Sequence, residues 1–200
     1  MPEWFEKVTI GALLDRLVQR CGEREALACA GQRWSFQQLQ AESDRAARGL
    51  MQCGIQPGDK VALWLTNRPE WLHILFAVAK IGAVLVPINT RFRTTDLEYV
   101  LRQSDTCMLI TTDHAGPIGY LDMVRELIPE LATCTTPQAL QTAAFPELRQ
   151  VSVVSAHTYP GTLRWQDVVA VGASVAVEPL AARQRAVDPD ATVLIRHYRK

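Results

Sequence analysis

The sequence lacks an excess of charge of either sign. Its 21 Lys and Arg residues balance 21 Asp and Glu residues, so the formal net charge at pH 7 is +0. A balanced charge gives no field over the whole protein that would attract nucleic acid or an anionic membrane. The last residues carry a small basic surplus with a single aromatic residue, Tyr198, so we expect no nucleic-acid partner.

The sequence also lacks paired cysteines, an export signal and a long apolar run. Its 5 cysteines are scattered and form no Cys-x-x-Cys pair, which favours a reducing compartment. The first residues include Glu3 and Glu6 and do not follow the basic and then apolar order of a secretory signal. The longest apolar stretch, 74–88, is interrupted by Lys80 and Pro87 and is shorter than the roughly 20 residues of a membrane span. We therefore predict a cytoplasmic protein without a transmembrane segment.

Neither a phosphate-binding loop nor a metal-ligand motif is complete in this sequence. The segment 116–119 has two glycines but lacks a third and a following Lys-Ser/Thr pair, and the segment 57–60 precedes a strand instead of a helix, so we interpret both as turns. The 4 histidines show no spacing that could bind a metal, and we expect no metal site among them; they are His73, His114, His157 and His197. No Gly-x-Ser-x-Gly motif supports a serine nucleophile.

Apolar periodicity predicts alternating strands and helices over much of the chain. Short apolar runs without alternation predict strands covered on both faces, at 60–65, 83–88, 107–111 and 151–155. Helical spacing and caps predict helices over 10–21, from 35 to about 52, from 67 to 79, from 95 and over 118–127, after a small hairpin at 26–34. Strand and helix therefore alternate as in βαβ units, which predicts an α/β fold with a mostly parallel sheet flanked by helices.

Two segments are candidates for bordering a ligand site. Asp113 and His114 follow a buried strand and so lie at the carboxyl edge of the predicted sheet, where ligands of α/β proteins bind. The segment 89–95 places Arg91 and Arg93 after another strand, where they could contact an anion. The structural interpretation is stronger for the second segment, because Thr95 is expected to cap the next helix. We interpret His73, inside the apolar helix, as a packing residue.

Several runs of residues, in order and spacing, resemble the N-terminal part of the adenylate-forming ligases. This AMP-dependent synthetase/ligase family includes acyl-CoA synthetases, peptide-synthetase adenylation domains and luciferases. The resemblance extends over residues 5–195, and the segment 90–101 looks most like the fatty-acyl, medium-chain and related acyl-CoA synthetases. The runs that carry it are 34–39, 54–62, 67–71 and 80–89.

The resemblance implies an enzyme that joins a carboxylic acid to ATP and then transfers the acyl group to coenzyme A, with magnesium offsetting phosphate charge. In that family the phosphate loop, later acidic and aromatic residues and a catalytic lysine lie in segments that have no counterpart here. We therefore assign no catalytic, cofactor-binding or metal-binding residue to this chain. ATP, Mg and CoA are expected for the full-length family and no cofactor for this chain alone.

The resemblance also leads us to expect a partial N-terminal domain over 1–195, a C-terminal domain that is absent, and an aberrant tail over 196–200. The segment 187–195 looks like the strand that leads into the family's phosphate loop. The codons of the last five residues, read one base later, permit Gly-Thr-Thr-Gly-Lys, and we interpret the tail as a shifted-frame reading of that loop. The nucleotide sequence from the Asp190 codon onward tests this hypothesis.

Two functions follow from these expectations. The first is a truncated acyl-CoA synthetase fragment that is inactive alone, because it lacks the groups that stabilise the transferring phosphoryl charge. The second is a non-catalytic binding or assembly module that a separately encoded ligase remainder would complement. A small nucleotide-binding or redox protein is disfavoured because the glycine fingerprint is missing.

Overall fold

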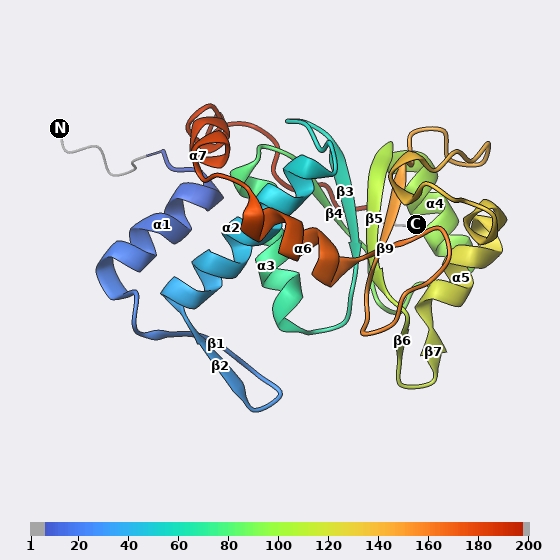
Figure 1. Ribbon diagram of the computed structural model, residues 1–200, viewed down its shortest axis with the longest axis horizontal. Helices are drawn as coiled ribbons and strands as arrows, with labels where there is room; N and C mark the ends of the chain where they lie inside the picture. The colour runs from blue at the N-terminus through green and yellow to red at the C-terminus, as the bar shows by residue number, and fades with distance from the viewer. Residues whose placement is uncertain (1–6, 198–200) are drawn as a thin grey trace.

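The computed structural model describes residues 7–197 and contains one five-stranded sheet with helices on both faces (Figure 1). The strands lie in the order β4-β3-β5-β8-β9, and every neighbouring pair is parallel. Their bounds are Lys60–Trp64 (β3), Val84–Pro87 (β4), Thr106–Thr112 (β5), Gln150–Val154 (β8) and Leu163–Arg164 (β9). The α/β class and the parallel sheet that the sequence predicts are therefore confirmed.

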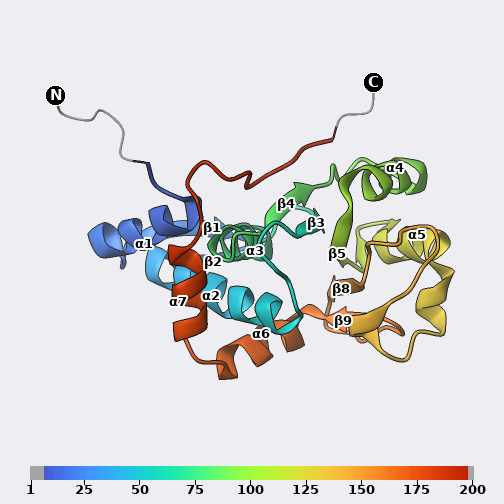
Figure 2. The same cartoon turned by 90° about the horizontal axis from the view of Figure 1, so that it is seen from above.

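Two layers of helices enclose this sheet (Figure 2). The first layer comprises α1 (Ile10–Cys21), α2 (Phe36–Gln52), α3 (Pro69–Lys80), α6 (Trp165–Ser174) and α7 (Glu178–Arg185). The second comprises α4 (Thr94–Ser104) and α5 (Tyr120–Leu127), followed by the short 3₁₀ turns Pro129–Ala132 and Pro137–Ala139.

Strand β3 shows why the sheet needs both layers. Val61 and Leu63 belong to the core between the sheet and the first helix layer, whereas Ala62 and Trp64 belong to the core on the opposite face. All four side chains are fully buried. Burying each of the larger ones contributes roughly 1.5–3 kcal/mol, so neither face of the strand can be left in water. This explains why the run shows no polar alternation.

Two small hairpins lie outside the main sheet. Strands β1 (Glu25–Cys29) and β2 (Gln32–Ser35) pair antiparallel, as the sequence predicts. Strands β6 (His114–Ala115) and β7 (Ile118–Gly119) form the second hairpin, with Gly116 at its tip. The segment 116–119 is therefore a hairpin turn, as its structural interpretation predicts.

The helix starts are predicted with mixed success. Ser35 forms the predicted capping box, because its side chain accepts from the Gln38 amide while the Gln38 side chain accepts from the Ser35 amide. The predicted caps at Asn67 and Thr95 are wrong. Helix α3 begins at Pro69 with Arg68 at the cap position.

Helix α4, in contrast, begins at Thr94, one residue before the predicted cap, so Thr95 lies inside its first turn. The reason is that the Asp96 carboxylate accepts from the Arg93 amide, at 3.2 Å. This backbone N–H at the cap position therefore has a partner without a cap at Thr95.

The C-terminal segment adds a short parallel edge to the sheet. The Leu85 amide donates to the Val193 carbonyl, and the Ile195 amide donates back to the Leu85 carbonyl, each at 2.9 Å. The chain around Leu194 therefore lies beside β4, in agreement with the strand expected within 187–195. Of the aberrant tail that the sequence suggests, residues 198–200 lie outside the described residues.

Candidate functional site at the carboxyl edge of the sheet

The strand order reverses at β3, and this topological switch point marks the carboxyl edge of the sheet as a candidate site. Strand β4 follows β3 along the chain and lies on one side of it, whereas β5 follows next and lies on the other side. In open α/β sheets, ligands bind outside the carboxyl ends of the strands at such a switch point. The loops that start at residues 65, 88, 113 and 155 leave this edge.

Arg68 bridges the ends of three strands at this edge. Its guanidinium donates from Nε and Nη2 to the two carboxylate oxygens of Glu70, at 2.9 and 3.1 Å. The Nη1 group donates to Thr112 Oγ1, at the end of β5, and to the Val154 carbonyl, at the end of β8, both at 3.4 Å. Burial raises the pKa of Glu70, but the Arg68 hydrogen bonds, the hydrogen bond from its own backbone amide and the charge of Arg68 together outweigh burial, so the pKa lies below its usual range. Arg68 therefore joins the loop after β3 to β5 and β8.

Asp113 is the second polar centre of the edge. Its carboxylate accepts from Ser155 Oγ at 2.6 Å, from Tyr159 Oη at 2.9 Å and from the His114 amide at 2.7 Å. Burial raises the pKa of Asp113, but these hydrogen bonds outweigh it and hold the pKa well below the usual range. The carboxylate thus fastens the loops after β5 and β8 to each other.

The structure therefore places the predicted pair Asp113 and His114 at the expected edge, but in different environments. Asp113 is enclosed by hydrogen-bond donors, whereas the His114 side chain is 68% exposed. The remaining predicted histidines are separate: His157 donates its amide to Ser155 Oγ, and His73 lies in α3.

The segment 89–95 uses its polar groups to hold its own conformation. Asn89 Oδ1 accepts from the Arg91 amide at 3.0 Å, and the Asn89 carbonyl accepts from Trp64 Nε1 at 3.1 Å. The Arg93 guanidinium donates to the carbonyls of Arg91 and Phe92, at 3.0 and 2.8 Å. This geometry agrees with the structural interpretation of the segment, since the Arg93 guanidinium is engaged by its own loop.

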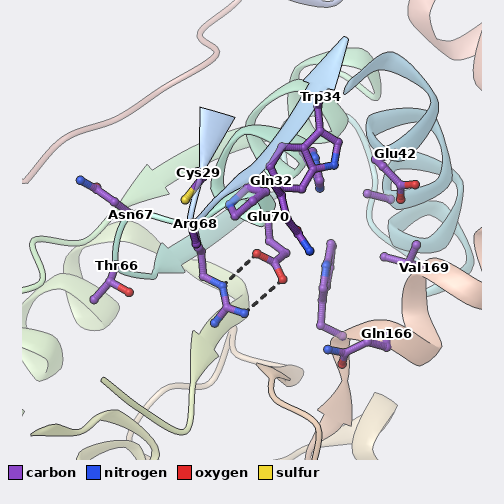
Figure 3. Close-up of a pocket in the computed structure, with 15 residues that line it drawn as sticks. Cys29, Gln32, Trp34, Glu42, Thr66, Asn67, Arg68, Glu70, Gln166 and Val169 are labelled. Atoms are coloured by element: carbon purple, nitrogen blue, oxygen red, sulfur yellow. Dashed lines mark hydrogen bonds and ion pairs between the residues drawn. The ribbon is translucent and has the colours of Figure 1, made fainter. Parts of the chain in front are cut away.

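A cavity of about 540 Å³ lies next to Arg68, between the first hairpin and helices α2, α3 and α6 (Figure 3). The Trp34 and Glu42 side chains face it from one side, and the Arg68–Glu70 ion pair faces it from the other. His73, which also lines it, is buried and makes an edge contact with Trp34, with ring centroids 6.4 Å apart. Burial holds the pKa of His73 below its usual range, so the imidazole is neutral at pH 7.

Neither Arg68 nor this cavity is among the site candidates that the sequence predicts. The signal for Arg68 was present, because an arginine between a buried strand and a proline-started helix lies at the carboxyl edge. The cavity could not be found in this way. It depends on Trp34 and Trp165, which are far apart in the sequence and meet only through tertiary packing.

Within residues 7–197, no group of three or more His, Cys, Asp and Glu side chains is arranged to hold a metal ion. No helix among the described residues is long and apolar enough to cross a membrane.

Comparison with known proteins identifies the family. The family described as AMP-binding enzyme matches residues 14–195, and the chain belongs to it. The relatives that resemble this chain are acyl-CoA synthetases and ligases.

YngI of Bacillus subtilis (strain 168), whose name assigns it to the acyl-CoA synthetases, is 34% identical over 191 residues. The mitochondrial medium-chain acyl-CoA ligase ACSF2 of Mus musculus is 36% identical over 166 residues. These matches cover 94% and 82% of this chain but 35% and 27% of the relatives, so the chain spans about a third of their length.

Solved structures show the same fold. The anthranilate CoA ligase AuaEII, in complex with anthranoyl-AMP, matches with a TM-score of 0.69 and 21% identity, over 82% of this chain and 28% of its own. A fatty acyl CoA synthetase of Mycobacterium tuberculosis matches with a TM-score of 0.64 and 20% identity, over 96% of this chain and 32% of its own. The sheet described above is thus the N-terminal fold of adenylate-forming ligases.

Proposed function

We propose that this chain forms the N-terminal part of an acyl-CoA synthetase. The reaction would join a carboxylic acid to ATP, releasing pyrophosphate, and would then transfer the acyl group from the adenylate to the thiol of coenzyme A, releasing AMP. The observation that supports it is the family match over 14–195 together with 36% identity to a medium-chain acyl-CoA ligase. That relative favours a medium-chain fatty acid as the substrate and a place in fatty acid metabolism.

The contribution of this chain would be structural. Arg68 and Asp113, two polar groups at the carboxyl edge, are both occupied by internal partners. Neither is free to stabilise charge that develops on a phosphate in the transition state. We therefore propose that the chain supplies the sheet and its edges, while the groups that contact ATP and coenzyme A come from polypeptide that this sequence does not contain.

We further propose a cytoplasmic location. The 5 cysteines are free thiols, distributed over separate elements, as suits a reducing compartment. ACSF2 is named as mitochondrial. Cell fractionation of a tagged protein tests the proposal: we expect the protein in the cytoplasmic fraction, and recovery in a mitochondrial fraction would contradict it.

Acyl-CoA formation by a fusion protein tests the activity. This chain replaces the 191 matched residues of YngI, and the purified fusion is supplied with ATP, magnesium, coenzyme A and a series of acids from acetate to palmitate. We expect acyl-CoA with the highest kcat/KM for medium-chain acids. The YngI remainder without this chain is the control and should be inactive. A fusion that is monodisperse and unfolds cooperatively, yet forms no acyl-CoA with any acid, would overturn the proposal.

A further inference from the structure

One carboxylate, that of Asp15, lies where four helices meet. Its Oδ1 accepts from Lys80 Nζ at 2.7 Å and from Gln40 Nε2 at 2.6 Å, and its Oδ2 accepts from Gln184 Nε2 at 2.5 Å. Asp15 belongs to α1, and its three partners belong to α3, α2 and α7. A single side chain of the first helix thus contacts three of the other four helices in this layer.

The network around Asp15 is held firmly because its cation is buried. The Lys80 side chain is 2% exposed, and its Nζ also contacts Asp44 Oδ1 at 2.6 Å. Gly11 lets α1 approach closely, since a Cβ at this position would meet Lys80 Cγ at 2.8 Å. Burial raises the pKa of Asp15, but the hydrogen bonds from Lys80, Gln184 and Gln40 outweigh it and lower the pKa. Asp15 is therefore ionised at neutral pH, as a buried ammonium requires of its partners.

Two stretches of chain lead from this network to the same strand pair. Lys80 ends α3, and the chain then turns directly into β4, which contains Leu85. Gln184 lies in α7, from which the chain passes Gly82, just before β4, and reaches the segment 193–195 beside β4 (Figure 2). Leu85 in β4 is paired with the segment 193–195. Asp15 thus contacts both α3, which precedes β4, and α7, which precedes the segment 193–195.

Helix α7 has few other attachments. Leu180 is its buried apolar residue, and Arg183 Nη1 donates to the Ile55 carbonyl at 2.6 Å. Arg183 Nη2 also donates to Gln56 Oε1 at 3.3 Å. The hydrogen bond from Gln184 to Asp15 is thus the polar link from α7 to α1, next to the links from Arg183 to residues 55 and 56.

We propose that Asp15 is a positioning residue that sets how the strand 193–195 lies against β4. Its value for the ligase reaction rests on the proposed function and on the resemblance of the segment 187–195 to the strand that precedes the family's phosphate loop. The positioning itself does not depend on that function, because it is a property of the folded chain.

Backbone amide hydrogen exchange of the 200-residue chain tests the proposal, and needs a folded protein but no activity. The reporters are the amides of Leu85 and Ile195, which join β4 to 193–195, and the reference is the amide of Ile110 in the centre of β5. The matched variants are Asp15→Ala and Asp44→Ala. Both remove one carboxylate from Lys80, but only Asp15 contacts α7. Gln184→Met removes the same contact from the α7 side while keeping the shape of the side chain.

We expect exchange at Ile195 to be about tenfold faster in Asp15→Ala and Gln184→Met, relative to Ile110, because a charge-assisted hydrogen bond is lost. We expect no selective increase in Asp44→Ala. Asp15→Asn should restore most of the protection, because its amide can donate to a rotated Gln184 side chain. Equal exchange at Ile195 in Asp15→Ala and Asp44→Ala, or unchanged exchange in Gln184→Met, would overturn the proposal. Gln184→Met decides the matter if Asp15→Ala does not fold.

Discussion

At the scale of single residues, Asp113 shows how a polar group at a ligand-binding edge can serve the fold. Ser155 and Tyr159 both donate to its carboxylate from the loop after β8. The ends of β5 and β8 are also joined by Thr112 Oγ1, which donates to the Val154 carbonyl at 3.2 Å, and by Arg68. The ionised carboxylate adds two hydrogen bonds between the loops that follow these strands.

Replacing Asp113 by Asn should lower the free energy of unfolding at pH 7 by about 2 kcal/mol, because hydrogen bonds to a charged acceptor contribute roughly 1.5–3 kcal/mol. Urea unfolding monitored by tryptophan fluorescence measures the change. The control is Asp122→Asn, an exposed aspartate in the first turn of α5, for which we expect a loss below about 1 kcal/mol. Equal losses in the two variants would contradict the assignment.

The same carboxylate should make stability depend on acid pH. Because the folded pKa of Asp113 is lowered, its contribution is present above the unfolded pKa of about 3.9 and disappears as the pH falls from there toward the folded value. The difference in unfolding free energy between the wild type and Asp113→Asn should therefore be constant from pH 7 to pH 5 and shrink toward pH 3. A difference that is the same at pH 3 and pH 7 would show that folding does not lower the pKa of Asp113.

Residue types alone could place Asp113 but could not assign its role. A carboxylate after a buried strand is expected at the carboxyl edge, and this was predicted. Its donors Ser155 and Tyr159 lie 42 and 46 residues further along the chain, and the parallel pairing of β5 with β8 brings them close.

At the scale of secondary-structure elements, the turn of the first hairpin holds Ala30 in a strained backbone conformation, which a substitution can relieve. Ala30 has φ 49° and Gly31 has φ 79°, the left-handed pair of a type I′ turn. A left-handed conformation costs alanine about 1 kcal/mol, whereas asparagine tolerates it. Ala30→Asn should therefore raise the unfolding free energy by about 0.5–1 kcal/mol.

The matched variant Gly31→Ala should lower it by about 1 kcal/mol, since no neighbouring atom lies near the added Cβ and only the backbone is strained. Thermal unfolding of both variants checks the two signs. A destabilised Ala30→Asn protein would show that the turn is not of this type.

Helices α2 and α6 cross at two glycines, Gly49 and Gly172. A Cβ on Gly172 would overlap the Arg45 carbonyl oxygen and the Gly49 amide nitrogen, and Arg48 Nε donates to the Gly172 carbonyl at 2.7 Å. Gly172→Ala should destabilise the protein by about 2–3 kcal/mol, because the helices must separate. Ala170→Val, on the exposed side of α6, should cost less than about 1 kcal/mol. Equal costs in urea unfolding would argue against the close crossing.

Elements with strong apolar patterns could be predicted, and elements defined by packing could not. Strand β3 and helix α3 follow from their uninterrupted apolar residues. Helix α6 was not predicted, because its sequence is rich in valine and alanine without a clear period and owes its place to contacts with α2. Helix α7 has a single buried residue, Leu180, and is held mainly by Arg183 and Gln184.

At the scale of the whole molecule, internal hydrogen bonds and an ion pair order the carboxyl edge of the sheet. The family could be inferred from the order of several short runs, and the match over 14–195 supports that inference. The cavity beside Arg68 could not be inferred, because Trp34 and Trp165 reach it from opposite ends of the chain.

Our central claim is that this chain supplies the sheet, whereas the remainder of a ligase supplies the groups that contact ATP and coenzyme A. Acid-dependent ATP–pyrophosphate exchange tests this claim most directly. The exchange is measured for the 200-residue chain alone, for the YngI remainder alone, and for the two joined as one polypeptide, with octanoate as the acid. We predict no exchange above the acid-free blank for either part alone and clear exchange for the joined protein. Exchange by the 200-residue chain alone, or none by a correctly folded joined protein, would contradict the claim.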